Sequence, residues 1–476
     1  MRSLIAMSCL MVLLSAAGLG ACATGPATED FSAQDSTQVT VTRDNGQWTA
    51  DYELTRDAPA WAYYRSSLTN GARLPWRTRD WQVVTPGVVL ERIGDLDVLR
   101  ATNGGNVPRR IRLKLTPRPD NLEADYAVLM FTDGSVAMPA GAFDIFPLQS
   151  MHAARTQDDS LNAFKAEGSN AHITWRDKAG PVLLHGRRQA EALTEDGNGY
   201  VLFGETKLTE SERLVTVVDP ELPAWITASI ENFAPRIADY YTERLGAGQS
   251  DKPTIMLAWS GPTDGKISFS GSVFPGLIVM NFEGRQLLTS SARALEQYRW
   301  FIGHESAHFW LGQTVHTEGP EESWITEGGA DLMAVRAAKA LDLAYDDRAE
   351  LQKEVDDCVR LAVRPIASAG QRGEHRAYYA CGAVFALAAE AAQKRADGGD
   401  WFAFLKPLIE ASRSDGVLTR TEWLARFTEV SRAADVSPLI EGLLTNGAAD
   451  PASAIAILFD RTGVAYRMAD GKIVLL

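Results

Sequence analysis

The sequence predicts an α+β protein of several domains, in which an all-β, sandwich-like domain is followed by a mainly helical one. A chain of 476 residues is too long for one ordinary hydrophobic core. Between about residues 38 and 215, apolar and polar residues alternate in short runs separated by turn signals, as in the strands of a sandwich. From residue 290 onward, nearly every segment has the apolar spacing of a helix. These patterns place a domain boundary near residue 218.

Composition and charge exclude several classes of protein. Hydrophobic residues make up 45% of the chain and charged residues 23%, which is typical of a folded globular protein and argues against wholesale disorder. The net charge of −14 argues against nucleic acid as a partner, because binding to phosphates needs a cationic surface. With only four cysteines, the chain is neither a structural zinc ribbon nor a disulfide-dense scaffold.

The first residues are typical of a secretory signal. Arg2 is the only charge among the first 21 residues, and the apolar run that follows is too short for a permanent membrane span. The run ends in Leu-Gly-Ala-Cys at residues 19–22, which resembles the lipobox of bacterial lipoproteins. The resemblance implies a signal peptide over residues 1–21 and a lipidated Cys22 at the mature N-terminus. An ordinary cleaved signal that happens to contain a cysteine is the alternative.

A lipidated Cys22 would tether the protein to a bacterial membrane. Several acyl chains would bind firmly, since each buried CH₂ contributes about 0.8 kcal/mol. Residues 22–37 are rich in Ala, Thr and Ser and are predicted to form a flexible tether. Ala23 lacks the acidic character that retains lipoproteins in the inner membrane of enteric bacteria. We therefore expect a lipid anchor in the outer membrane, with the protein facing the periplasm.

Two cysteines, Cys358 and Cys381, remain after Cys9 leaves with the signal and Cys22 takes the lipid. In an oxidising compartment they could form a disulfide that closes a loop of about 24 residues and stabilises the fold by about 3 kcal/mol. Two free, buried thiols are the alternative.

A candidate metal site begins at residues 304–308, which read His-Glu-Ser-Ala-His. On a helix, His304 and His308 share one face, so that both imidazoles can reach one metal ion. Glu305 lies beside them, placed to take a proton from the attacking water. A motif of this length also arises by chance and is only suggestive by itself.

A third candidate ligand, Glu327, follows His308 by nineteen positions and opens the next predicted helix. Two helices that carry His, His and Glu ligands resemble the gluzincin metallopeptidases. The match is closest to the family that includes alanyl aminopeptidases and leukotriene-A4 hydrolase, which has H-E-x-x-H and, eighteen residues later, Glu within W-[LI]-x-E-G. Residues 324–328 read Trp-Ile-Thr-Glu-Gly, and the residues after the first motif follow the family's H-x-W-x-G-x-x-V as His308, Trp310, Gly312 and Val315.

The resemblance implies a thermolysin-like, mainly helical zinc-peptidase domain over residues 219–395, followed by a C-terminal helical region over 396–476. It implies one Zn²⁺ per chain with His304, His308 and Glu327 as ligands, and Glu305 as the general base. The predicted β domain, residues 38–218, agrees with the family only in architecture.

The family also stabilises the oxyanion with a tyrosine in a Y-x-K-G-A segment. Residues 379–383 read Tyr-Ala-Cys-Gly-Ala, which implies this role for Tyr379, although Cys381 replaces the family's lysine. Its neighbour Tyr378 is an alternative, and packing in a helix core would explain either residue. Asp331, one turn after Glu327, is predicted to accept a hydrogen bond from a ligand histidine.

One segment departs from the family. Its G-A-M-E-N sequence contains a Glu that binds the free α-amine of the substrate, but here residues 271–275 read Gly-Ser-Val-Phe-Pro and Phe274 replaces that Glu. The backbone of an edge strand could still hold an extended peptide.

These observations predict a membrane-tethered zinc metallopeptidase that hydrolyses peptide or protein substrates, aminopeptidase-like but without the amine-binding Glu. Cleavage at N-termini and cleavage inside chains both remain open. The alternatives are a non-catalytic peptide-binding or assembly lipoprotein that keeps the fold, and a hydrolase of a non-peptide substrate.

Overall fold

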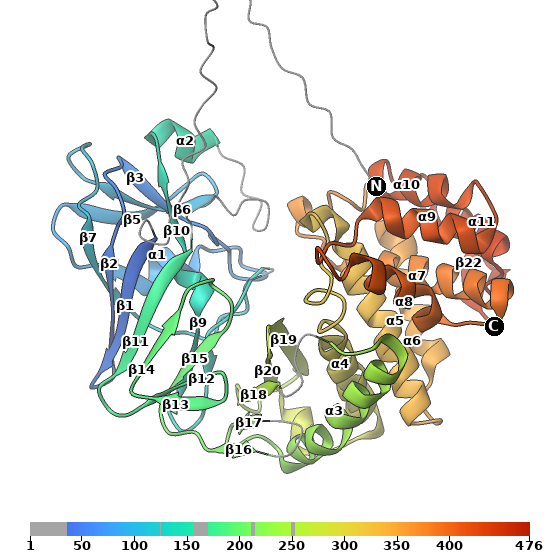
Figure 1. The fold of residues 1–476 in the computed structure, drawn as a ribbon, viewed down its shortest axis with the longest axis horizontal. Coiled ribbons are helices and arrows are strands. Elements are labelled where there is room, and N and C mark those ends of the chain that lie inside the picture. The colour runs from blue at the N-terminus through green and yellow to red at the C-terminus, as the bar shows by residue number, and fades with distance from the viewer. Residues whose placement is uncertain (1–35, 124, 157–169, 211–214, 249–252) are drawn as a thin grey trace, which may run out of the picture.

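In the computed structural model, the described residues are 36–476 except 124, 157–169, 211–214 and 249–252. The predicted signal peptide and Cys22 lie outside them, as does nearly all of the predicted tether. A β-rich region and a helical region lie side by side, with a smaller sheet between them (Figure 1). The fold class predicted from the sequence, an all-β region followed by a mainly helical one, is confirmed.

Three sheets form the β-rich region. Strands β1 and β2 form a hairpin through Asn45 and Gly46, and β1 also pairs in parallel with the distant β11. The first sheet has the order β14-β11-β1-β2-β7-β4, the second β10-β3-β6-β5 and the third β13-β12-β15-β9-β8. The elements are β1 (Thr37–Asp44), β2 (Gln47–Glu53), β3 (Ala60–Tyr63), α1 (Trp76–Asp80), β4 (Trp81–Val83), β5 (Val88–Ile93), β6 (Leu96–Ala101), β7 (Arg110–Leu115), β8 (Leu129–Met130), β9 (Val136–Pro139), η2 (Ala140–Phe143), β10 (Ile145–Leu148), α2 (Met151–Thr156), β11 (Ala171–Asp177), β12 (Val182–Leu184), β13 (Arg187–Gln189), β14 (Glu191–Thr194) and β15 (Tyr200–Phe203).

Aromatic side chains fill the core of this region. Trp81 packs on Phe143 and Phe143 on Trp175, with ring centroids 5.0 and 5.3 Å apart. Each such ring buries about 150–250 Å² and contributes strongly to the hydrophobic free energy of this core. The core also encloses the ion pair Arg77–Asp97, whose two side chains are completely buried, and Arg92 reaches the same carboxylate at 3.2 Å.

The sheet between the two regions has the order β16-β17-β18-β20-β19. Its strands are β16 (Leu208–Glu210), β17 (Val215–Val218), β18 (Thr254–Trp259), β19 (Ser268–Phe274) and β20 (Leu277–Glu283). Two of them end at or before residue 218 and three follow it, so the sheet spans the predicted domain boundary, which stays a prediction. Strand β19 is at the edge, next to the candidate site.

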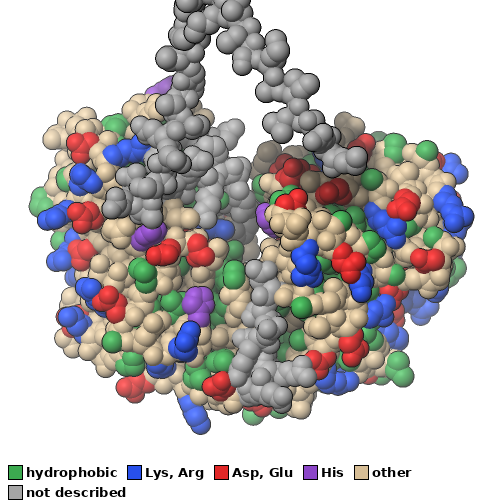
Figure 2. Space-filling view, viewed as in Figure 1, with side chains coloured by type: hydrophobic (Ala, Val, Ile, Leu, Met, Phe, Trp, Pro, Cys, Tyr) green, Lys and Arg blue, Asp and Glu red, His purple; other side chains and the backbone are tan. Residues whose placement is uncertain are grey.

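The helical region packs around one large core. Its longest helices, α3, α5 and α7, carry apolar residues on the faces turned to their neighbours. No helix among the described residues is both long enough and apolar enough to cross a bilayer. On the face shown in Figure 2, acidic and basic side chains are interspersed. The elements are α3 (Ala224–Leu245), η3 (Arg285–Leu288), α4 (Ala292–Ala307), η4 (Pro320–Glu322), α5 (Ser323–Leu341), α6 (Asp347–Leu361), η5 (Gly370–Arg372), α7 (Arg376–Asp397), α8 (Trp401–Ser412), α9 (Arg420–Ser431), α10 (Val436–Thr445), α11 (Pro451–Thr462), β21 (Tyr466–Ala469) and β22 (Lys472–Leu475).

Candidate metal centre and active site

Helices α4 and α5 cross closely, and this crossing brings the predicted ligands together. The Ser291 side chain caps the start of α4 by accepting a hydrogen bond from the Ala294 amide. Near the end of α4, Gly303 lies against Ala334 of α5, where an added Cβ would be only 3.1 Å from the Ala334 backbone. A side chain at position 303 would therefore push apart the two helices that carry the candidate ligands.

Three donor atoms converge between these helices. The Nε2 atoms of His304 and His308 are 3.0 Å apart, and Glu327 Oε2 lies 3.3 Å from the first and 3.5 Å from the second. Three ligands at tetrahedral corners around one Zn²⁺ would be about 3.3 Å from one another, given bonds of about 2.0–2.1 Å. Among the described residues, this is the one group of three or more His, Cys, Asp or Glu side chains arranged to hold a metal ion.

The electrostatics of the cluster also fit a cation. Glu327 Oε2 is buried and accepts no hydrogen bond from any described residue. Burial acts to raise the pKa of Glu327, but the charge of His308 and contacts with both imidazoles lower it below its usual range. An ionised carboxylate oxygen without a hydrogen-bond donor is costly in a buried site, and a metal ion would compensate its charge.

Each histidine is oriented through its other ring nitrogen. His304 Nδ1 lies 2.8 Å from Asp331 Oδ1, and His308 Nδ1 lies 2.8 Å from the Leu311 carbonyl oxygen. Burial acts to lower the pKa of His304, but the hydrogen bond to Asp331 and the charges of Asp331 and Glu327 raise it well above its usual value. These contacts leave both Nε2 atoms pointing at the same space. Asp331 is thus in contact with His304, and its role as the support of a metal ligand stays a prediction.

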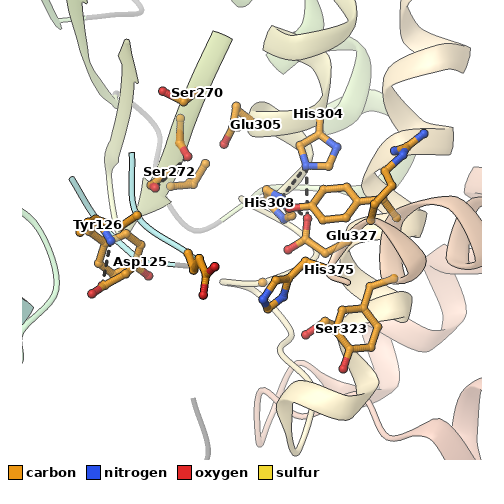
Figure 3. Close-up of a pocket in the computed structure, with 18 of the residues that line it drawn as sticks. Asp125, Tyr126, Ser270, Ser272, His304, Glu305, His308, Ser323, Glu327 and His375 are labelled. Carbon is orange, nitrogen blue, oxygen red and sulfur yellow. Dashed lines mark hydrogen bonds and ion pairs between the residues drawn. The ribbon is translucent and has the colours of Figure 1, made fainter. Parts of the chain in front are cut away.

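Glu305 lines the same pocket, and no hydrogen bond or ion pair joins its carboxylate to another described residue. Burial raises the pKa of its carboxyl above the ordinary value, although the two histidines oppose this shift. An added Cβ at Gly271 would come within 3.0 Å of Glu305 Oε1, so the backbone of edge strand β19 passes directly beside this carboxylate. Figure 3 shows Glu305 between the His304 ring and strand β19, which carries Ser270 and Ser272.

Tyr379 also reaches the site, whereas Tyr378 does not supply a free hydroxyl. The Tyr379 ring stacks on His304 with centroids 5.6 Å apart, and the charge of Glu327 together with burial raises the pKa of its phenol well above the usual value. It therefore stays a hydrogen-bond donor. The Tyr378 hydroxyl donates to the Ala367 carbonyl and accepts from the Gly370 amide.

Close backbone contact fixes the helix that carries Tyr379. An added Cβ at Gly328 of α5 would lie 2.1 Å from the backbone of Gly382 in α7, so the helices touch at two glycines. A disulfide between Cys358 and Cys381, with Cα atoms 4.7 Å apart, joins α6 to α7. The glycine of the Glu327 motif and the glycine of the Tyr379 segment therefore serve one purpose, the close approach of their helices.

The pocket has a volume of about 580 Å³ and is lined by residues from both regions of the molecule. The sequence did not predict the contributions from the β-rich region, because they belong to no motif. They are Asn70, Asn121, Leu122, Glu123, Asp125 and Tyr126. The sequence also did not predict His375 and Arg376, which lie just before Tyr379. Proximity to Tyr379 in the chain was the one signal that could have found this last pair.

The sequence matches no family model and no curated protein. Its fold nevertheless resembles that of solved structures. One is an aminopeptidase N family protein from Idiomarina loihiensis, with a TM-score of 0.59, 10% identity and coverage of 88% of this chain and 78% of that chain. Another is native leukotriene A4 hydrolase from Saccharomyces cerevisiae, with a TM-score of 0.51, 12% identity and coverage of 90% and 72%. Because the identities are this low, the similarity shows the fold alone. That fold is the arrangement of a β-rich region followed by a helical region.

Proposed function

We propose that this protein is a zinc metallopeptidase of the gluzincin type that hydrolyses peptide bonds. One observation carries the proposal: three converging donor atoms share a pocket with an unpaired carboxylate, that of Glu305, and a phenol, that of Tyr379. A structural metal site needs neither of the last two groups. One fold neighbour is named as an aminopeptidase N family protein and the other as a hydrolase, which supports a hydrolytic function.

His304, His308 and Glu327 would hold the ion, with Asp331 orienting His304. Zn²⁺ supplies Lewis acidity, which polarises a carbonyl and makes water a better nucleophile near neutral pH. The carboxylate of Glu305 takes the proton of the attacking water and returns it to the leaving amine. Its raised pKa suits a group that must do both. The Tyr379 hydroxyl donates to the oxygen on which negative charge develops.

A signal peptide, a lipidated Cys22 and attachment to the periplasmic side of the outer membrane complete the proposal. Peptides or proteins of the cell envelope would then be the substrates. The support for this part is the Leu-Gly-Ala-Cys sequence at residues 19–22 and the apolar run before it. Labelling with a radioactive fatty acid in cells, with Cys22→Ala as the control, tests the lipid directly.

Substitution Glu305→Gln tests the catalytic part. The protein is expressed without residues 1–22 and loaded with Zn²⁺, and cleavage of a mixed peptide library is followed by mass spectrometry. We expect cleavage by wild type and a loss of about three orders of magnitude or more in Glu305→Gln, with the zinc content unchanged. Glu296→Gln is the matched control, because Glu296 is exposed on the same helix.

If wild type and Glu305→Gln both leave every peptide intact, the protein is no peptidase under these conditions. The non-catalytic peptide-binding lipoprotein then becomes the better hypothesis. Equal cleavage by the two proteins would instead point to a contaminating protease.

A further inference from the structure

We infer that this site does not depend on a free α-amine in its substrate. It cleaves peptide bonds that have further residues or a blocking group, such as acetyl, on their N-terminal side. The inference rests on the proposed peptidase function and names its substrate class. It follows from the charges of the described residues that line the pocket.

An enzyme that selects free N-termini must bind an ammonium group in a site that is largely shielded from water. Removing an ammonium group from water is costly unless a carboxylate without another cationic partner receives it. Four carboxylates line the pocket among the described residues: Glu123, Asp125, Glu305 and Glu327. Two of them belong to the proposed metal ligands and general base, which leaves Glu123 and Asp125.

Glu123 is already neutralised by an arginine. Both of its carboxylate oxygens accept hydrogen bonds from Arg73 Nη1, each at 2.8 Å. Arg73 in turn lies against Gly373, where an added Cβ would be 3.2 Å from its guanidinium. This ion pair therefore sits at the contact between the β-rich and helical regions, with its charge satisfied.

Asp125 is neutralised more completely. One carboxylate oxygen accepts hydrogen bonds from Arg65 at 3.2 Å and from the Tyr126 amide at 2.8 Å, and the other accepts one from the Ser67 hydroxyl. The Arg65 guanidinium also lies over the Tyr126 ring, 4.4 Å from its centroid. Figure 3 shows Asp125 and Tyr126 across the pocket from the histidines, so this is the side that a substrate residue would face.

Strand β19 adds no charge of its own. Phe274, which stands where the sequence comparison places an amine-binding Glu, is 2% exposed and turns away from the pocket. Its ring packs on Tyr126 at 4.4 Å and on Tyr200 at 5.4 Å, in the interface with the β-rich region. Phe274 therefore contributes to the packing between strand β19 and the β-rich region.

The pocket offers no unpaired cation for a terminal carboxylate either. Arg376 is the one Arg or Lys among the described lining residues, and it is bound by Glu354 at 2.7 Å and by Asp357 at 2.9 Å. What remains near the strand is neutral and suits peptide groups: the β19 backbone and the side chains of Asn70, Asn121, Ser270 and Ser272.

The test compares matched peptides, identical except that one carries a free N-terminus and the other an N-acetyl group, at the bond that the library identifies. We expect the two values of kcat/KM to agree within about threefold, and cleavage to occur inside the acetylated peptide. A preference of tenfold or more for the free amine, which corresponds to about 1.4 kcal/mol, would overturn the inference. If neither peptide is cut while the zinc site is filled, the proposed function fails and the inference fails with it.

Arg73→Gln provides a test in the opposite direction. It should free the Glu123 carboxylate from its ion pair. The ratio of kcat/KM for the free peptide to kcat/KM for the acetylated peptide should then rise by at least threefold. Arg73 is largely exposed, so the fold should tolerate the change. Arg110→Gln, an exposed arginine on β7, is the control and should leave the ratio unchanged. An unchanged ratio in Arg73→Gln would contradict the electrostatic basis of the inference.

Discussion

The two regions of the molecule each bury a cluster of ionisable side chains, but only one of the two clusters converges on a point where a metal ion would fit. In the β-rich region, Arg77 donates to Asp97 at 2.8 Å and to the Ala142 carbonyl at 3.2 Å, and its guanidinium lies 4.4 Å from the centroid of the Tyr63 ring. In the helical region, two imidazole nitrogens and a carboxylate oxygen face one another, and the carboxylate oxygen lacks a donor.

The difference separates a structural ion pair from a site built for a ligand. A buried pair in which the two charges meet directly compensates much of their desolvation, although Arg77 Nε has no hydrogen-bond partner among the described residues. The histidine cluster instead directs two imidazole nitrogens and one carboxylate oxygen at one point, where a metal ion could accept an electron pair from each. Changes to the first cluster should therefore alter stability, and changes to the second should alter metal binding and activity.

The largest effect is expected from His308→Ala. With one ligand gone, peptide hydrolysis should fall by about three orders of magnitude or more, because Lewis acidity is worth several kcal/mol in the transition state. The stabilisation that wild type gains from excess Zn²⁺, about 4.1 kcal/mol at a thousandfold excess over Kd, should also vanish. Thermal unfolding with and without EDTA measures this gain. His152→Ala, an exposed histidine on α2, is the control; an equal loss there would contradict the site assignment.

Arg77→Ala should destabilise the protein by about 3 kcal/mol, because the buried Asp97 carboxylate keeps only its longer contact with Arg92, at 3.2 Å. Urea unfolding measures the loss, and the folded fraction should still bind zinc. The double variant Arg77→Met/Asp97→Leu removes both charges and should recover most of the lost stability. If the double variant is as unstable as the single one, the pair is not self-compensating in the sense argued above.

Tyr379→Phe should lower kcat by about a hundredfold while KM and zinc content stay near their wild-type values, because a donor to the developing oxyanion is lost. Tyr378→Phe is the matched comparison on the same helix. It should instead cost about 1 kcal/mol of stability, since that hydroxyl bonds to backbone groups, and leave kcat nearly unchanged. Exchanged results for the two variants would assign the catalytic hydroxyl to Tyr378.

The comparison also shows which parts of the site could be predicted from the sequence. His304, Glu305 and His308 lie within one turn of a helix, so local periodicity is enough to place them together. Tyr378 and Tyr379 could not be separated in this way, because adjacent residues on a helix differ only in direction, and the direction depends on how α7 packs on α5. Glu123 and Asp125 reach the pocket only through the docking of the two regions.

The same reasoning explains what could be predicted of the fold. Alternating apolar residues indicated strands in the β-rich region, but not that β1 pairs in parallel with β11, because that contact joins segments separated by more than a hundred residues. No sequence motif predicts the ion pair between Arg77 and Asp97. The lipid on Cys22 and the roles of the site residues stay predictions.

Asp331→Asn should have the smallest effect and is the sharpest test of the comparison, because it changes charge with little change in shape. The asparagine side-chain oxygen can still accept the hydrogen bond from His304 Nδ1, so the ring should keep its direction. What is lost is the negative charge that makes His304 a better ligand, and zinc affinity should fall by about 10- to 100-fold. Competition with a chromophoric chelator measures this affinity.

His308 provides the internal reference, since its Nδ1 already bonds to a neutral carbonyl. If Asp331→Asn binds zinc as tightly as wild type, the two histidines are equivalent ligands and Asp331 serves only packing. A loss confined to Asp331→Asn, with stability in EDTA unchanged, would show that the charge of Asp331 acts on the metal and not on the fold.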